Sequence, residues 1–361
     1  MTNKMRQYFP MIHTRKEVLD EIEAKPKLKQ IFQSWEEKHQ QEFLDFCTGV
    51  KGVKIMYDFI SKEILNPETV PERVEELLSI LMGQQVHIKE VLPNDGTRIA
   101  EESSLVIMDI VVELEDGSIV NLEVQKIGYK FPGARSACYS ADLLLRQYKK
   151  VRSKKGKGFN YTDVKDVYTI VLFEKSPSEF LEFSDMYIHY FEQHSNTGIK
   201  VNLLQKYLFI SIDIFLEYQH NIGMKLETRR DAWLAFMGSD DPDIILEIIK
   251  KYPDFKEMYQ QVYEICQNIE EVMGMFSKEL AEMDRNTVQL MIDEMQEVIN
   301  EKKNELKEQD DKLKEQDDKL KEQNDKLKEQ DDKLKEQTNK IEEQNQIIEE
   351  LLKRLNRLED K

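Results

Sequence analysis

The segment from Glu305 to Asn339 repeats a seven-residue unit whose commonest form is KLKEQDD. Apolar residues recur in it at strict intervals of seven, which is typical of α-helical coiled coils. The apolar positions are Leu306, Leu313, Leu320, Leu327, Leu334, Ile341, Ile348 and Leu355. The same register extends back to Val288 and forward to Leu358, so we predict a single helix about 105 Å long at 1.5 Å per residue.

The composition of this helix leaves two structures open. If the apolar residues take the a positions, glutamines from Gln309 to Gln344 take the d positions, and firm apolar layers return only between Ile348 and Leu358. One structure is an oligomerisation rod, which would make the chain a homo-oligomer. The other is a single charged helix supported by Glu–Lys pairs four residues apart. We favour the rod.

Charge separates this helix from the rest of the chain. The 361 residues contain 52 Lys and Arg against 70 Asp and Glu, a net charge of −18. Residues 300–361 account for −4 and hold only 12 apolar residues in 62, too few to bury a core alone. The length of the whole chain allows about two domains. The net charge excludes a protein that coats nucleic acid by bulk charge, but it allows a local basic groove.

The location of the chain follows from what its sequence lacks. No apolar run approaches the length of a membrane span, and the N-terminus has no apolar signal-peptide core. Cys47, Cys138 and Cys266 are few and far apart, which fits a reducing compartment and excludes a disulfide framework or a CxxC zinc site. The six histidines show no ligand spacing. We expect a cytoplasmic protein with no membrane partner.

The pattern along the first 299 residues predicts helices, a run of strands, one helix, more strands and then helices. Helical patterns cover residues 14–46, 53–65, 71–81, 133–150, 242–251 and 255–280, and strand patterns cover 86–92, 105–114, 119–124, 167–173 and 207–212. This order predicts an α/β (or α+β) fold with a small mixed sheet flanked by helices. We expect four parts: an N-terminal helical segment (1–47), a core (48–225), a helical subdomain (226–287) and a coiled coil (288–361).

Residues 104–125 read SLVIMDIVVELEDGSIVNLEVQ and predict a β-hairpin. A two-residue turn at Asp116-Gly117 would misalign the apolar faces of the two strands. A three-residue loop instead pairs Leu114 with Ser118 and puts Gly117 in a left-handed conformation. We therefore predict the three-residue loop.

In that register Asp109 lies opposite Glu123, and Gln125 lies on the same face. Two carboxylates on adjacent strands make a candidate divalent-cation site, because Mg²⁺ prefers oxygen ligands and usually keeps several waters. Such an ion lowers the pKa of a bound water and stabilises charge on a phosphoryl group. The alternative is a solvated hairpin face with ordinary acids. Val111 and Asn121 share this face.

The helix after the hairpin is basic. Arg135, Tyr139 and Arg146 fall on one helical face. Six basic residues follow within nine positions: Lys149, Lys150, Arg152, Lys154, Lys155 and Lys157. This set predicts phosphate binding, and the alternative is a solvated loop.

A strand Asp, a second strand with E-x-Q and a following helix with Arg resemble the PD-(D/E)XK nuclease superfamily. More narrowly, the chain resembles the PD-(D/E)XK nuclease family transposases, the group of recombination-promoting nucleases, over about residues 45–300. The stretches that carry the resemblance are YDFISKEILNPE (57–68), MDIVVELEDGSIVNLEVQKIGYKFPGARSACYSADLLLRQY (108–148), YTDVKDVYTIVLFEKSP (161–177), DAWLAFMGSDDPDII (231–245) and FSKELAEMDRNTVQLMIDEM (276–295).

The resemblance implies a restriction-endonuclease-like core in which Asp109 and Glu123 hold Mg²⁺ or Mn²⁺. Gln125 would complete the catalytic set at the position of the superfamily's Lys, a substitution common in this family. Lys126 should point to the opposite face by strand alternation. An extra acid would come from the preceding helix, as Asp58 or Glu63.

The resemblance also implies that Arg135 and Tyr139 contact the scissile phosphate or the DNA backbone. The function implied is a metal-dependent DNA endonuclease that acts in recombination or on mobile elements; a toxin or defence role would use the same chemistry. The alternative is a catalytically weak or inactive nuclease-fold protein that binds DNA or a partner and is oligomerised by its coiled coil. Two features favour that alternative: Gln125 stands where the superfamily has Lys, and the first 299 residues carry a net negative charge.

Overall fold

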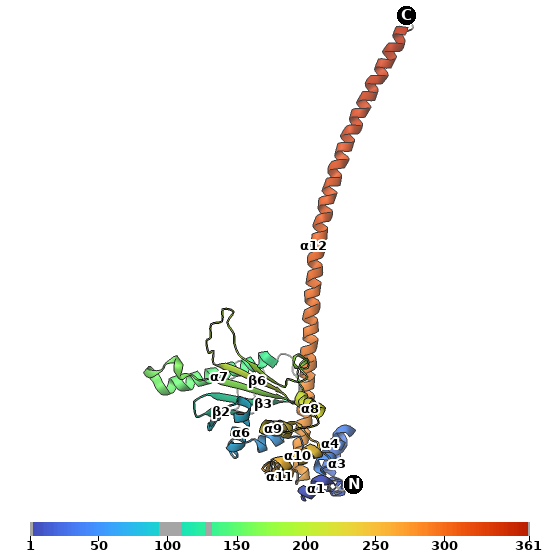
Figure 1. The fold of residues 1–361 in the computed structure, drawn as a ribbon. Helices are drawn as coiled ribbons and strands as arrows, with labels where there is room; N and C mark the ends of the chain where they lie inside the picture. The colour runs from blue at the N-terminus through green and yellow to red at the C-terminus, as the bar shows by residue number, and fades with distance from the viewer. Residues whose placement is uncertain (1–2, 94–109, 127–131, 360–361) are drawn as a thin grey trace. The chain divides into compact units, whose positions relative to one another are not determined.

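The structure is a computed structural model that describes residues 3–93, 110–126 and 132–359 (Figure 1). The chain forms two compact units, Met1–Met291 and Ile292–Lys361. The first unit contains a mixed six-stranded sheet flanked by helices, which confirms the predicted fold class. Within the described ranges, no helix is both long enough and apolar enough to cross a membrane.

Helices precede the first strand, and their ends follow local sequence signals. They are α1 (Lys4–Tyr8), α2 (Arg15–Ala24), α3 (Pro26–Ser34), α4 (Glu37–Cys47), α5 (Asp58–Ile64) and α6 (Pro71–Met82). Thr14 and Glu17 form a reciprocal capping box at the start of α2. The helical stretch predicted at 14–46 is divided, because Pro26 disfavours the helical conformation at Lys25.

The sheet has the order β1-β2-β3-β4-β6-β5. Its strands are β1 (Ile88–Val91), β2 (Ile110–Leu114), β3 (Ile119–Gln125), β4 (Val167–Phe173), β5 (Ile188–Phe191) and β6 (Gln205–Ser211). The central strands β3, β4 and β6 are parallel, and the outer pairings are antiparallel. The sequence pattern did not predict β5, whose two last residues are exposed and show no apolar alternation.

The hairpin of β2 and β3 has the predicted register. Val111 pairs with Asn121 and Val112 with Val120, and the Leu114 N–H donates to the Ser118 carbonyl at 2.8 Å. Gly117 closes the three-residue loop with a positive φ of 89°, a conformation that favours glycine. The apolar alternation was therefore sufficient to set this register.

The two faces of the sheet are covered by different helices. On one face, Val112, Val120 and Ile170 join the large core formed with the N-terminal and C-terminal helices. The other face is covered by α7 (Pro132–Lys155) (Figure 1). Tyr139 and Leu143 of α7 pack against the sheet there. α7 extends five residues beyond the helix predicted at 133–150, so most of the basic stretch is helical.

The rest of the first unit is helical, with short 3₁₀ turns between elements. The helices are α8 (Ile212–Asn221), α9 (Arg229–Gly238), α10 (Pro242–Lys251), α11 (Phe255–Ile265) and α12 (Ile269–Glu359), and the turns are η1 (Gly156–Gly158), η2 (Tyr161–Asp163) and η3 (Ser178–Phe180). The helix predicted at 255–280 is split into α11 and α12, because the Asn268 side chain caps a new start. α9 was not predicted, since it is buried all round and shows no amphipathic period.

The second unit is the continuation of α12, which confirms the predicted long helix. Its apolar stripe is exposed in the single chain, with Leu306 and Leu334 at 61% and 64%. Pairs of Glu and Lys four residues apart run along the same helix, for example Glu315 with Lys319 at 2.7 Å. Such pairs support an isolated helix, and they are not evidence against a rod, so the oligomeric state stays a prediction.

Candidate functional site

Strand β3 carries a row of buried polar side chains on the face that α7 covers. Asn121, Glu123 and Gln125 are 0%, 4% and 5% exposed. They share this face because successive strand residues point to opposite sides. Asn121 Nδ2 donates a hydrogen bond to Glu123 Oε1 at 2.9 Å, and Gln125 Nε2 donates to Glu123 Oε2 at 3.4 Å. The two amides hold the carboxylate between them.

Two oxygens beside this carboxylate lack a donor among the described residues. Asn121 Oδ1 and Gln125 Oε1 are buried and accept no hydrogen bond within the part of the chain that the structure describes. The Thr169 hydroxyl, on the β4 residue paired with Asn121, is in the same state. Leaving a buried polar group unsatisfied costs about 1–3 kcal/mol, and native proteins usually satisfy such groups with water, an ion or a ligand. We call Asn121, Glu123, Gln125 and Thr169 the polar layer.

The chemistry of the polar layer fits a divalent cation. Carboxylate and amide oxygens are the ligands that Mg²⁺ prefers. Among the described residues, no group of three or more His, Cys, Asp or Glu side chains is placed to hold a metal ion. Asp109, the predicted partner of Glu123, lies outside the described residues. A site built here from described residues would therefore combine one carboxylate with amide oxygens.

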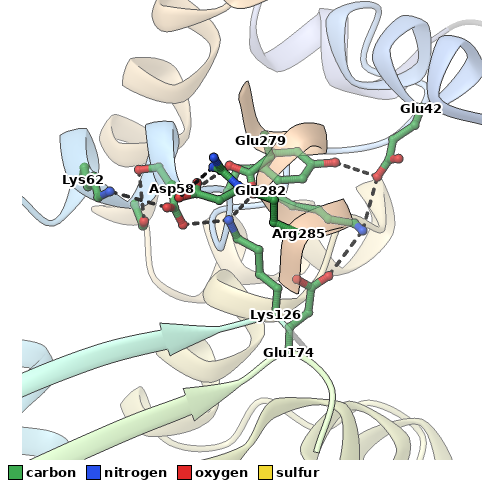
Figure 2. Close-up of polar contacts among 11 residues, drawn as sticks. Glu42, Asp58, Lys62, Lys126, Glu174, Glu279, Glu282 and Arg285 are labelled. Carbon is green, nitrogen blue, oxygen red and sulfur yellow. Dashed lines mark hydrogen bonds and ion pairs between the residues drawn. The ribbon is translucent and has the colours of Figure 1, made fainter. Parts of the chain in front are cut away.

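The residue after Gln125 points its side chain to the other side of the sheet, as strand alternation predicts. Lys126 Nζ lies 2.7 Å from Asp58 Oδ1 and also binds the carboxylate of Glu279 (Figure 2). Glu279 Oε2 accepts a hydrogen bond from the Asp58 N–H at 3.0 Å. The side chains of Lys126 and Glu279 are only 7% and 1% exposed. We call Asp58, Lys126 and Glu279 the ionic cluster.

The pKa values in the ionic cluster reflect burial opposed by opposite charge. Burial alone would raise the pKa of Asp58, but the charge of Lys126 and its hydrogen bond outweigh it, and the net pKa lies below the ordinary value. Burial likewise opposes the charged form of Lys126, yet the two carboxylates raise its pKa above the ordinary value. For Glu279 burial is the stronger effect, and its pKa is raised.

These contacts bear on the predicted extra acid. The carboxylate of Asp58 accepts from Lys126 and, at 3.4 Å, from Lys62. Glu63, the other candidate, is exposed on α5. Lysines thus occupy the Asp58 carboxylate, and metal binding by Asp58 stays a prediction.

The start of α7 places its predicted DNA-contacting residues differently. Arg135 is exposed, and its guanidinium lies 5.4 Å from the centre of the Tyr139 ring. Tyr139 is 3% exposed and packs with Val111 and Ile119 in the core beneath α7. Of these two residues, Arg135 is therefore the one that is accessible to a phosphate.

The end of α7 and η1 carry the basic stretch, residues 149–157. Lys149, Lys154 and Lys157 are exposed there. Lys150 instead binds Glu113 at 2.7 Å and Glu90 at 2.5 Å.

Two further basic residues of this region also have acidic partners. Lys155 binds Asp163 at 2.5 Å. Arg146 binds Asp142 at 2.7 Å and donates to the Pro93 carbonyl at 3.0 Å. The usable positive charge is therefore smaller than the sequence count, although cations at a helix C-terminus are favoured by its dipole.

The structure separates the basic stretch from the polar layer. Gln147 donates to the Gly117 carbonyl at 2.8 Å and accepts from the Lys165 N–H at 2.8 Å. The end of α7 therefore lies over the turn that precedes β3. Gly117, in this turn, is six residues before Glu123, a span of about 20 Å in extended chain.

Three residues now belong to the description that the sequence analysis did not select as site residues: Asn121, Thr169 and Glu279. Asn121 carried a usable signal, because a lone amide in an apolar strand is unusual unless it has a partner. Glu279 carried none, since it lies 153 positions from Lys126. Only the packing of the first part of α12 within the unit Met1–Met291 brings Glu279 beside Lys126.

One comparison with known proteins identifies a family. The model of the family described as PD-(D/E)XK nuclease family transposase matches residues 55–290, about two thirds of the chain. No curated protein and no solved structure matches. The matched range spans the sheet, α7 and the first part of α12, and so includes the polar layer and the ionic cluster.

Proposed function

Because the chain belongs to the PD-(D/E)XK nuclease family transposases, we propose that it is a metal-dependent endonuclease that hydrolyses phosphodiester bonds in DNA. The polar layer is the observation that carries this proposal. It combines a buried carboxylate with two buried amide oxygens that lack donors among the described residues. A recombination or mobile-element role follows from the family alone, and a toxin or defence role would use the same site.

In this proposal Glu123 and Asp109 hold Mg²⁺ or Mn²⁺, and Gln125 completes the catalytic set. When bound, such an ion lowers the pKa of a water and stabilises charge on the phosphoryl group. Gln125 and Asn121 hold the Glu123 carboxylate through their amide nitrogens, which leaves their oxygens to face the ion or its waters. Gln125 has no charge, so its contribution is orientation. Asp58 is proposed as an additional ligand only if Lys126 releases it.

The DNA path in this proposal follows α7. Arg135, with Tyr139 supporting its guanidinium, contacts the backbone at the start of α7. Toward the other end of α7, the basic residues contact the backbone farther along the duplex: Arg146, Lys149, Lys150, Arg152, Lys154, Lys155 and Lys157. The rise of α7 between Arg135 and Lys154 is about 28 Å, which corresponds to roughly eight base pairs. Both contacts then fall on one duplex.

A plasmid-cleavage assay with Mg²⁺, Mn²⁺ and Ca²⁺ tests the proposal. The wild type should nick or linearise the plasmid with Mg²⁺ or Mn²⁺, while Glu123→Ala and Asp109→Ala should not. Glu115→Ala is the matched control, because Glu115 is an exposed acid on the same hairpin. Cleavage by Glu123→Ala at the wild-type rate would show that the site assignment is wrong.

A second function is favoured by the ionic cluster. The lysine next to Gln125 is bound by Asp58 and Glu279, so it does not replace the superfamily's Lys. The protein would then be an inactive nuclease-fold module that binds DNA or a partner. Isothermal calorimetry separates the two functions, since the module predicts no Mg²⁺ binding that depends on Glu123.

The organisation of the chain completes the proposal. The four parts are residues 1–47, 48–225, 226–287 and 288–361, and the last assembles the protein as a homo-oligomeric coiled coil. Light scattering should give a smaller oligomer for a chain truncated at residue 300 than for the full chain. Equal oligomeric states would contradict the rod. A cytoplasmic location is supported by the three cysteines, which are all free.

A further inference from the structure

A pocket of about 860 Å³ lies beside the basic stretch, at the end of α7. Its apolar wall is formed by Leu144, Tyr148, Tyr161, Val164 and Leu204. This volume falls in the range of small-molecule sites, about 300–1,000 Å³. The pocket lies over the turn before β3, so it is separate from the polar layer.

Aromatic rings define the shape of this pocket. The rings of Tyr148 and Tyr161 are nearly parallel, with an angle of 12° and 6.3 Å between their centres. Phe159 packs edge-on against both, at 5.5 Å and 5.3 Å. Tyr161 is 74% exposed despite these contacts. An exposed ring held in a fixed orientation is a platform on which a planar base can stack.

The charges around the pocket distinguish a base from a phosphate. Asp116, Asp166 and Lys165 line it, so the lining carries two carboxylates against one ammonium group. The carboxylates can accept hydrogen bonds from exocyclic amino groups of a base. Outside it, the Arg152 guanidinium lies 5.6 Å from the centre of the Tyr148 ring. Lys149 and Lys154 are exposed on the same helix. The base-accepting pocket is thus flanked by the cations that a sugar–phosphate backbone requires.

We infer that this pocket receives an unpaired nucleobase of the DNA, while the basic stretch binds the adjoining phosphates. The inference rests on the proposed function and deepens it, because it names single-stranded or distorted DNA as the preferred substrate class. A paired base cannot enter, since it is stacked within the duplex. The pocket therefore selects DNA in which a base is already free.

The test is a fluorescence-anisotropy titration in EDTA, so that cleavage plays no part. The full chain is titrated with a duplex and with the same duplex carrying one unpaired adenine. The wild type should bind the second DNA more tightly. Tyr161→Ala should lose about fivefold to a hundredfold affinity for the unpaired DNA, the range for one base–aromatic stack, with little change for the duplex.

Tyr190→Ala is the matched control, because Tyr190 is 65% exposed on β5, away from the pocket. It should bind both DNAs like the wild type, and circular dichroism should show both variants folded. A second readout is 2-aminopurine at the unpaired position, whose fluorescence should be quenched by the wild type and by Tyr190→Ala but not by Tyr161→Ala.

Equal affinity of the wild type for the two DNAs, or equal behaviour of Tyr161→Ala and Tyr190→Ala, would overturn the inference. These outcomes are independent of the plasmid-cleavage result. A protein that cleaves through Glu123 but shows no preference for the unpaired base keeps its proposed function and loses this inference. A protein that does not cleave but shows the Tyr161-dependent preference supports the inference.

Discussion

Gln125, the last residue of β3, and Lys126, which follows it, belong to two buried polar groups that differ in kind. Gln125 belongs to the polar layer, where two amide oxygens lack donors among the described residues. Lys126 belongs to the ionic cluster, where each charge faces an opposite charge. Both groups are costly to bury, but only the ionic cluster provides its own compensation.

The difference between the polar layer and the ionic cluster helps to distinguish functional residues from structural ones. A buried group that is satisfied internally holds elements together, here β3, α5 and α12. A buried group that the described residues leave incomplete must be completed by other residues of the chain, by water or by a ligand. Substitutions on the two faces of β3 should therefore affect different measurements.

The largest expected effect is on stability, at Lys126. Lys126→Met leaves Glu279 buried without the charge of Lys126 and leaves Asp58 with Lys62, so we expect a loss of about 3–5 kcal/mol in the free energy of unfolding. Urea denaturation followed by circular dichroism measures it. The triple variant Asp58→Asn, Lys126→Met, Glu279→Gln should recover most of this loss. If the triple variant is no more stable than Lys126→Met, the cluster is not held by charge compensation.

The next effect is on cleavage, at Glu123. Glu123→Gln keeps the size of the side chain and removes the charge that would hold a cation, so plasmid cleavage should fall more than about a hundredfold. The urea midpoint should change little, in contrast to Lys126→Met. A large loss of stability with cleavage retained would reverse the distinction between the two faces.

A smaller effect is expected for the neighbouring amide. Gln125→Leu removes both the hydrogen bond to Glu123 and the unsatisfied oxygen. We expect metal affinity to fall about 10- to 100-fold, measured by calorimetry. The metal-free protein should become no less stable, because a costly buried oxygen is gone. Destabilisation of the metal-free variant would mean that Gln125 is a structural residue.

The smallest effect is on the pH dependence of stability. The lowered pKa of Asp58 contributes stability above its unfolded pKa, which is lost as the pH falls through the lowered folded value. The raised pKa of Glu279 has the opposite sign, because its contribution is present below its ordinary value of 4.5 and is lost as the pH rises through the folded value. Between pH 4.5 and 7, urea midpoints of Glu279→Gln should therefore decline less with pH than those of the wild type. If the urea midpoints of the variant and the wild type decline equally with pH, groups other than Glu279 cause the decline.

Local periodicity accounts for the parts of the fold that the sequence predicted. Alternation of apolar residues and the position of Gly117 led to the correct hairpin register. It also placed Glu123 and Gln125 on one face. The prediction was less accurate where elements are short or uniformly buried, as in β5 and α9, because such segments show no period. Helix breaks at Pro26 and Asn268 were missed for a different reason, since helical propensity continues on both sides.

The sequence by itself determined the long α12 helix, the hairpin and the face on which Glu123 lies, because backbone geometry turns a spacing of seven or two residues into a shared side. The tertiary structure decided which carboxylates bind Lys126 and that Tyr139 is buried. It also placed the end of α7, which carries the basic stretch, at Gly117, about 20 Å along the extended chain from Glu123. These relations join residues far apart in the chain. They arise only when helices and sheet pack, and no local period encodes them.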